Sequence, residues 1–282
     1  MDFDNKRRLE LSAGAIDYAD VGSGPVLVFV HGVFVNGDLW RLVAPELAAD
    51  FRCIVLTLPL GAHAVPMRPD ADLSPLGLAK LIAEVIDNLE LRDVTLVGND
   101  TGGALCQLVI AHHPKHITRI VLTNCDALEY FPPASLAPIY LVARIPGSFG
   151  LLAGALRSHR AQAIFFATVA KSKPDKSFLA DTFRTFVADG AVRRDLQKTL
   201  GAVSKRDTLA AADTFAAFRG RALVVWGKDD LFFPVKLGER LARKFPNASF
   251  ELIENCRTLV PMDAPMRLIS SIRSFVGTPM AV

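Results

Sequence analysis

The sequence lacks several features that define specialised classes of protein. None of its 4 cysteines forms a C-x-x-C pair, and three lie in or at the end of apolar runs, which favours buried free thiols in a reducing compartment. The 32 basic residues nearly balance the 29 acidic ones, and no basic stripe with interleaved aromatics occurs, which argues against a nucleic-acid partner. There is no run of 18 apolar residues and no apolar core of a signal peptide. We therefore expect a soluble, cytoplasmic protein without a membrane partner.

Motifs for metals and nucleotides are missing as well. No metal-ligand spacing of His, Cys, Asp or Glu occurs, and "GSGP" at residues 22–25 is typical of a turn rather than of a dinucleotide fingerprint. The densest basic cluster, "NKRR" at residues 5–8, is interpreted as a solvated terminus. With 282 residues, of which 51% are hydrophobic, the chain has enough material for one domain with an insertion. The sequence thus predicts an activity that needs neither a cofactor nor a metal.

Short apolar runs that favour strands alternate with stretches of helical spacing. The apolar runs are 16–21, 26–30, 53–58, 94–97, 117–123, 222–226 and 250–253, and the helical stretches are 76–89, 103–113, 235–245 and 266–275. Continuous apolar strands that alternate with helices are typical of an α/β protein whose mostly parallel sheet is covered on both faces.

One segment interrupts this alternation. From residue 126 to about 218 no convincing strand occurs, whereas the segment has prolines at 132, 133, 138, 146 and 174 and helical stretches at 161–170 and 178–187. The sequence therefore predicts an α/β core in two parts, residues 1–126 and 216–282. A helical lid, or cap, over residues 127–215 is expected to lie between the two parts.

A tight turn in "VTLVGNDTGGALCQL" carries a carboxylate. Gly98 and Gly102 flank Asp100, after an apolar strand and before a helical stretch. Glycines remove the β-carbons that would clash as the chain reverses, and the following helix directs free N–H groups and the positive end of its dipole at the turn. This pattern indicates a nucleophile elbow with Asp100 as the nucleophile. The alternative interpretation is an aspartate that only caps the helix.

Two other strand ends offer partners for Asp100. In "LVFVHGVF", His-Gly follows a strand, where an oxyanion hole would use the backbone N–H of Val33 together with that of Thr101. In "LVVWGKDDLFFP", a later strand ends in an acidic turn. Asp230 is the better-placed orienting acid in this turn, and Asp229 is the alternative; either could also be a solvated turn residue.

These pieces resemble the α/β-hydrolase fold superfamily over nearly the whole chain. The resemblance rests on "HGVF", "GNDTGG", "VLTNCDA", "WGKDDLFFP" and "LIENCRTLVPMDAP". An aspartate at the elbow resembles the branch of haloalkane dehalogenases, haloacetate dehalogenases and epoxide hydrolases. The resemblance implies a mostly parallel eight-stranded sheet flanked by helices, with the lid inserted before the last two strands. It also implies that Asp100 attacks carbon and that histidine-activated water hydrolyses the resulting ester.

The histidine that the resemblance requires is missing. Thr258 stands at its position after the last strand, and none of the 6 histidines follows His159. A carboxylate is already ionised near neutral pH and can attack without a base, but threonine cannot activate water at pH 7. His63, in a loop after a strand, and His159, in the lid, are the candidate substitute bases. His31, in the oxyanion loop, is interpreted as structural.

The lid carries the residues expected to shape a pocket. The phenylalanines at 165, 166, 178, 183 and 186 favour an apolar pocket, although packing alone would explain most of them. Tyr130 and Tyr140 are the only tyrosines near the lid, where epoxide hydrolases would place a pair. Thr101 and Val33 stand where dehalogenases of this branch carry halide-binding side chains.

Three hypotheses about function follow. The first is a cofactor-independent hydrolase with an aspartate nucleophile, acting on a small apolar substrate of the halide, epoxide or ester type. The second is a lyase or isomerase in which Asp100 is a general base and the two amides stabilise an enolate or alkoxide. The third is a catalytically impaired ligand-binding protein. A homodimer is possible in each case.

Overall fold

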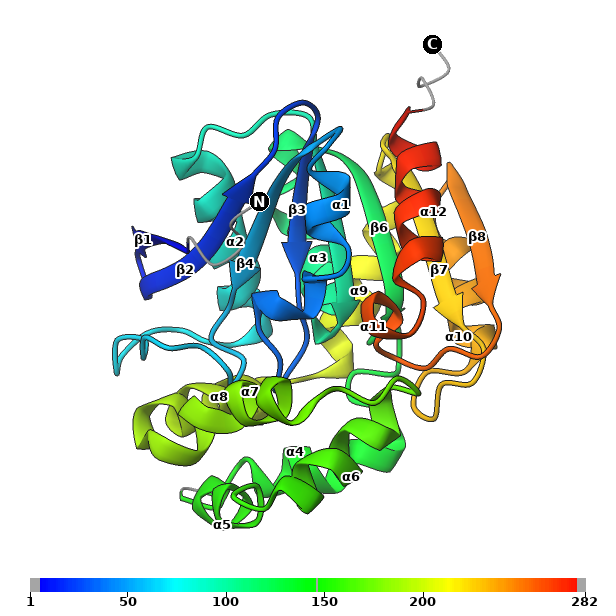
Figure 1. Cartoon of the computed structure of the whole chain (residues 1–282). Coiled ribbons are helices and arrows are strands. Elements are labelled where there is room, and N and C mark those ends of the chain that lie inside the picture. The colour runs from blue at the N-terminus through cyan, green and yellow to red at the C-terminus, as the bar shows by residue number, and fades with distance from the viewer. Residues whose placement is uncertain (1–5, 146, 278–282) are drawn as a thin grey trace.

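An eight-stranded sheet runs through the middle of the chain (Figure 1), in the order β1-β2-β4-β3-β5-β6-β7-β8. The computed structural model describes residues 6–145 and 147–277. β2 pairs antiparallel with β1 and β4, and all other neighbours are parallel. The predicted mostly parallel eight-stranded sheet is therefore confirmed. The strands are β1 (Arg7–Leu11), β2 (Gly14–Val21), β3 (Val26–Val30), β4 (Arg52–Thr57), β5 (Val94–Asp100), β6 (Ile117–Cys125), β7 (Arg221–Gly227) and β8 (Ala248–Ile253).

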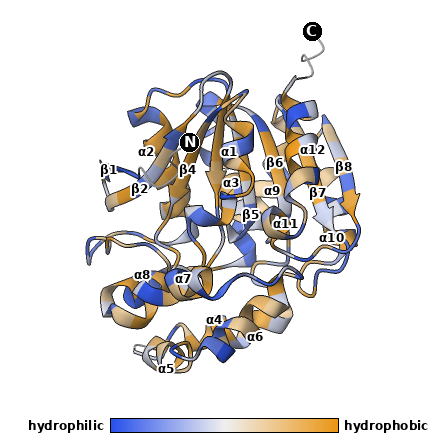
Figure 2. Cartoon of the chain, in the orientation of Figure 1, coloured by the Kyte–Doolittle hydropathy of each residue, from blue (hydrophilic) through white to orange (hydrophobic). Residues whose placement is uncertain are grey.

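Helices cover both faces of the sheet. One face packs against α2 (Pro75–Asn88), α3 (Thr101–His112), α9 (Lys205–Thr214) and α10 (Val235–Ala242), and the other against α1 (Ala44–Leu47), α11 (Val260–Asp263) and α12 (Pro265–Gly277). Short 3₁₀ turns are η1 (Gly37–Trp40), η2 (Pro114–His116), η3 (Ala134–Leu136) and η4 (Phe215–Ala217). The central strands are apolar along their length (Figure 2) because side chains on both of their faces are buried. The four cysteines are free and buried.

Five helices between β6 and β7 lie beyond the carboxyl ends of the parallel strands (Figure 1). We call them the inserted helices: α4 (Ala137–Val142), α5 (Phe149–Ala155), α6 (His159–Val169), α7 (Lys176–Ala188) and α8 (Gly190–Ala202). None of the helices in the described part of the chain combines the length and the apolar character needed to cross a bilayer.

Helix α9 does not belong with the inserted helices. It packs along α3, and Phe215, directly after α9, stacks on Phe245 with ring centroids 4.5 Å apart. The Thr208 hydroxyl of α9 donates to the carbonyl of Leu128 at 2.6 Å. The sequence-based boundary at residue 215 therefore assigns a core helix to the lid. We infer that the insertion ends before Lys205.

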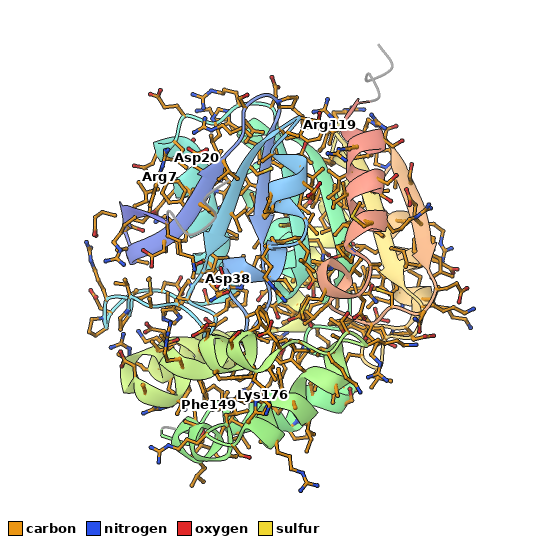
Figure 3. All side chains as sticks on the ribbon, in the orientation of Figure 1. Arg7, Asp20, Asp38, Arg119, Phe149 and Lys176 are labelled. Atoms are coloured by element: carbon orange, nitrogen blue, oxygen red, sulfur yellow. The ribbon has the colours of Figure 1, made fainter. Side chains whose placement is uncertain are left out.

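The first strand is absent from the sequence-based list of apolar runs. Arg7 and Arg8, interpreted as part of a solvated terminus, lie in β1 and form ion pairs across the strand pair with Asp20 at 3.1 Å and Asp17 at 2.8 Å (Figure 3). An edge strand of the sequence "RRLEL" has only two apolar side chains. Such a strand gives too weak an alternation to stand out from a polar terminus.

Glycines at the elbow allow the strands and helix to approach closely. A β-carbon on Gly102 would lie 2.3 Å from the Val30 carbonyl oxygen and 2.5 Å from that of His31. Gly154 in α5 has nothing within 4 Å of its corresponding position. Gly102 therefore has no space for a side chain, whereas Gly154 has, and the two positions can be compared by the same substitution.

We expect Gly102→Ala to lower the free energy of unfolding by roughly 2–4 kcal/mol, because backbone atoms must move to accept the methyl group. Gly154→Ala should raise it by about 0.5–1 kcal/mol, since alanine favours helix. Urea unfolding followed by circular dichroism measures both. Equal effects of the two substitutions would contradict the close approach at the elbow.

Candidate active site

Asp100 lies at the junction of β5 and α3 with a strained backbone. Its φ is 55° and its ψ is −133°, a conformation that non-glycine residues seldom adopt. Although it precedes the first helical residue, its side chain makes no capping hydrogen bond to α3. The strain instead turns the carboxylate out of the turn and toward the loop after β3.

Two backbone N–H groups hold this carboxylate. Val33 N–H donates to Asp100 Oδ2 at 3.3 Å, and the Thr101 N–H is also directed at the carboxylate and lowers the pKa of Asp100. The approach of the Val33 loop depends on Gly32, because a β-carbon there would lie 2.1 Å from Asp100 Oδ2. The arrangement is that of an oxyanion hole occupied by one carboxylate oxygen.

His31 stabilises the loop of residues 32–33 through hydrogen bonds of its ring. Its Nε2 accepts from the Leu58 N–H at 2.9 Å, so its Nδ1 carries the proton and donates to the Gly32 carbonyl at 2.8 Å. Burial lowers the pKa of His31 to about 4, and the ring is neutral at pH 7. With both nitrogens in use, His31 has a structural role, as the sequence suggests.

Asp100 opens into an apolar cavity of about 370 Å³. The only lining residues with polar side chains are Asp100, Tyr140 and Thr168; the others are Val33, Phe34, Val35, Leu136, Ile139, Phe165, Phe166, Val169, Leu200, Phe232, Phe233 and Leu259. The core loops supply one side of this lining, and the inserted helices α4, α6 and α8 supply much of the rest. Loss of hydration in this cavity raises the pKa of Asp100 to about 7, and the negative charge of Asp230 adds to the effect.

Asp230 lies in the turn after β7 and faces the interior. Its Oδ1 accepts from the N–H groups of Phe232 at 2.7 Å and Phe233 at 3.0 Å, and its Oδ2 accepts from Asn124 Nδ2 at 2.7 Å. Asp229, the alternative, points the other way and forms an ion pair with Lys171, which lowers the pKa of Asp229. Of the two acids, Asp230 is therefore the one directed at the site.

Thr258 is buried next to Asp230. Burial raises the pKa of Asp230, and the Thr258 side chain is among the groups that offset part of this rise. The Thr258 hydroxyl has no hydrogen-bond partner among the described residues. The Thr258 carbonyl accepts from Asn99 Nδ2 at 2.7 Å, which ties the loop after β8 to the residue before Asp100. Thr258 thus lies beside Asp230, and the next residue, Leu259, lines the cavity.

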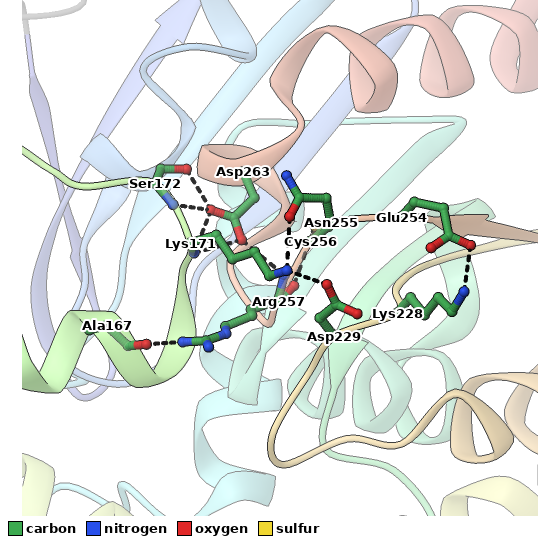
Figure 4. A network of polar contacts seen from close by, with 10 residues as sticks. All are labelled: Ala167, Lys171, Ser172, Lys228, Asp229, Glu254, Asn255, Cys256, Arg257 and Asp263. Atoms are coloured by element: carbon green, nitrogen blue, oxygen red, sulfur yellow. Dashed lines mark hydrogen bonds and ion pairs between the residues drawn. The ribbon is translucent and has the colours of Figure 1, made fainter.

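A polar network holds the Thr258 loop against the inserted helices (Figure 4). Asp263 accepts from the backbone N–H groups of Lys171, Ser172 and Arg257 at 2.8–3.0 Å. The Arg257 guanidinium also donates to the Ala167 carbonyl at the end of α6. The cation next to Thr258 therefore points away from the cavity and fixes the end of α6.

A second buried carboxyl group lies close to Asp100, and the sequence gives no signal for it. Asp126, just after β6, accepts from Thr101 Oγ1 at 3.0 Å, and its Oδ1 has no partner among the described residues. Burial, followed by the charge of Asp100, raises the pKa of Asp126 well above its usual range. Burial, followed by the charges of Asp126 and Asp100, raises the pKa of Tyr140 well above its usual range, so the Tyr140 hydroxyl is protonated at neutral pH.

Neither candidate substitute base is among the residues that line the described cavity. His63 is buried on the other side of the oxyanion loop, where its Nε2 lies 3.3 Å from Asp195 Oδ2 of α8. His159 is exposed at the start of α6 and borders a separate surface groove with Lys171. The described residues also contain no cluster of three side chains that could hold a metal ion. The geometry offers no histidine to the carboxylate.

This combination of fold and elbow defines a protein class. The family described as alpha/beta hydrolase fold matches residues 25–265, and the chain belongs to this family. Haloalkane dehalogenase 2 of Mycobacterium tuberculosis is 25% identical over 272 residues, covering 94% of this chain and 93% of that protein. The human monoacylglycerol lipase ABHD6 is 21% identical over 263 residues, covering 91% and 77%.

Solved structures show the same fold. An α/β hydrolase fold protein from Burkholderia ambifaria matches with a TM-score of 0.82 at 22% identity, covering 97% of this chain and 98% of that one. The haloalkane dehalogenase DbeA from Bradyrhizobium elkani matches with a TM-score of 0.80 at 17% identity, covering 97% of both. The relatives therefore include dehalogenases and a lipase, two classes of hydrolase.

We expect Asp100→Asn to stabilise the protein above neutral pH. The pKa of Asp100 is raised on folding, so the folded state favours the protonated form, and wild-type stability is lost as pH rises toward about 7. Urea unfolding should show equal stability of the two proteins at pH 4 and a gain of roughly 1–3 kcal/mol for the variant at pH 8. A difference that does not grow with pH would mean that the carboxylate is well hydrated.

Proposed function

We propose that the protein is a cofactor-independent hydrolase-type enzyme in which Asp100 attacks the electrophilic carbon of a small apolar substrate. The observation that carries this proposal is the Asp100 carboxylate in an apolar cavity, with Oδ2 held by the Val33 N–H at 3.3 Å. Holding one oxygen leaves the other directed at the substrate. A carboxylate that has lost its hydration is also a stronger nucleophile, because no water shell must be removed first.

The first chemical step needs only groups that line the cavity. The free oxygen of Asp100 forms a bond to carbon, and a halide, or the oxygen of an opened epoxide ring, leaves with the bonding electrons. The Tyr140 hydroxyl lines the same cavity and remains protonated, so it can donate a hydrogen bond to a leaving oxygen. The products are an alkyl ester on Asp100 and the leaving group.

The second step lacks its base. Water must add to the ester carbonyl, and the resulting oxyanion at Oδ2 would be stabilised by the N–H groups of Val33 and Thr101. Removal of the proton from that water needs a positioned base, and Thr258 cannot provide one. Asp126 does not line the described cavity, so it does not replace the histidine. The proposed enzyme therefore forms the ester faster than it hydrolyses it.

A second function is favoured by one specific observation, the pKa of about 7 at Asp100. A general base works best when its pKa is near the working pH. In a lyase or isomerase, Asp100 would remove a proton next to a carbonyl group, and the substrate's oxyanion would take the two amides. A carbonyl probe would then exchange that hydrogen for deuterium from solvent, with no change in the mass of the protein.

Incubation with a short alkyl bromide or a terminal epoxide should add one alkyl group to the wild type, located at Asp100 by peptide mass spectrometry. The rate should rise with pH and level off above about 7, because only the ionised carboxylate attacks. Asp100→Asn should give no adduct. Asp229→Asn is the matched control, an exposed acid of the nearby turn, and should react like the wild type. Equal labelling of Asp100→Asn and wild type would refute the nucleophile.

We expect Thr258→His to shorten the lifetime of the ester. An imidazole beside Asp230 would activate water, and positioned general bases contribute about 10²–10⁴-fold. Single- and multiple-turnover rates for wild type, Thr258→His and Thr258→Phe test this, because phenylalanine has similar bulk and no base. The wild type should show little steady-state turnover. Efficient wild-type turnover, or equal rates for the two variants, would contradict the assignment of the missing base to this position.

A further inference from the structure

A long segment that includes the first three inserted helices has no acidic side chain. From Tyr130 to Pro174 there is no aspartate or glutamate, so all 29 acidic residues of the chain lie outside it. The same segment has 5 basic residues, Arg144, Arg157, Arg160, Lys171 and Lys173. It forms α4, α5 and α6, which are the layer farthest from the sheet, with α7 and α8 closer to it (Figure 1).

This outer layer exposes large apolar side chains. Leu151 on α5 is 85% exposed, Leu141 on α4 64%, Ile164 on α6 61%, and Ile145 after α4 58%. Their neighbours in the same helices, such as Phe149 and Phe166, are buried against the rest of the protein. We call the four exposed residues the outer face. Single exposed apolar residues are ordinary, but four on adjacent helices indicate a contact surface.

A basic groove lies next to the outer face, between α4–α5 and α8. It encloses about 720 Å³, and its lining includes Arg144, Arg193, Arg194 and Lys198 but no acidic residue. Arg193 donates to two backbone carbonyls, which hold the guanidinium without cancelling its charge. Arg194 is paired with Asp195, leaving three cations without an acidic partner in the lining. The groove is therefore suited to an anionic group.

We propose that the outer face docks on an anionic lipid surface, with its apolar side chains entering the acyl region and the basic groove receiving a phosphate headgroup. Apolar residues flanked by Arg and Lys are the pattern of a helix layer that lies in a membrane interface. The sequence lacks an apolar run of 18 residues and so predicts no membrane partner, but binding in a membrane interface does not need such a run. Each cation near an anionic surface contributes about 1 kcal/mol, a factor of about five in affinity.

Charge decides between a lipid surface and a second copy of the chain. A symmetric dimer through the outer face would bring two copies of this basic segment together, with Arg144, Arg157 and Arg160 on each side and no acid from the segment to pair them. An anionic bilayer satisfies the arginines and buries the apolar side chains together. The charge pattern therefore favours the lipid.

The docking surface leads to the cavity. Ile139 of α4 lines the Asp100 cavity and is also 38% exposed, and the same helix carries Leu141 of the outer face. An apolar substrate dissolved in the bilayer would thus reach Asp100 without crossing water. This assignment of the substrate to membrane-dissolved compounds rests on the proposed function, whereas the docking itself does not involve Asp100.

Cosedimentation with vesicles tests the docking without any substrate. We expect the full chain to bind vesicles of equimolar dioleoylphosphatidylglycerol and dioleoylphosphatidylcholine, and to bind much less to phosphatidylcholine alone or at high salt. Leu151→Asp should weaken binding by about tenfold or more. Met266→Asp is the matched control because Met266 is 66% exposed on α12, away from the outer face, and should bind like the wild type. Asp100→Asn should also bind fully, which separates docking from catalysis.

A second pair of variants tests how much the basic residues contribute to vesicle binding. Arg157→Glu should weaken binding by about tenfold or more, whereas Lys115→Glu, an exposed lysine of η2, should leave it unchanged. Equal binding to both kinds of vesicle, or equal effects of Leu151→Asp and Met266→Asp, would overturn the proposal. So would sedimentation equilibrium that shows a dimer in solution, lost in Leu151→Asp, because the outer face would then bind a second copy.

Discussion

The structure depends on one constraint, the close approach of the β3 loop to the turn after β5. Gly32 and Gly102 permit this approach because neither position has space for a β-carbon. The result is a carboxylate that exchanges its water shell for two backbone N–H groups and an apolar cavity wall. Burial would strongly favour protonation, and the N–H groups offset part of that cost, which leaves the pKa of Asp100 at about 7. Such a carboxylate can act chemically either as a nucleophile or as a general base.

Around this centre, hydrogen bonds hold Asp230 and the loop that carries Thr258, and no histidine lines the described cavity. Asp230 keeps three hydrogen bonds, although the Thr258 hydroxyl beside it is unpaired among the described residues. Asn99 and Asp263 continue to fix the loop that carries Thr258. The histidine position is thus rigidly built. This rigidity is consistent with an enzyme in which ester formation and ester hydrolysis are separable, and it makes Thr258 the natural point at which to restore the second step.

Sequence patterns predict those parts of the structure that depend on residues close together in the chain. Long apolar runs mark the parallel strands, and the glycine spacing marks the elbow at Asp100. Asp126 could not be found this way, because nothing near it in sequence reveals that β6 ends beside Thr101. The same applies to His63, whose partner Asp195 is far along the chain in α8. The sequence pattern places α9 in the lid because an amphipathic pattern does not show which surface the helix covers. The contact of α9 with α3 is visible only in three dimensions.

The central claim is that Asp100 is a desolvated carboxylate with a pKa near neutrality. Carboxyl-carbon NMR of protein labelled at aspartate, with Asp100→Asn to assign the resonance, measures this directly. The account predicts that the Asp100 signal titrates with a pKa of about 7. A midpoint near 4, the value of a hydrated aspartate, would contradict it and would remove the physical basis for a desolvated nucleophile and for a general base matched to neutral pH.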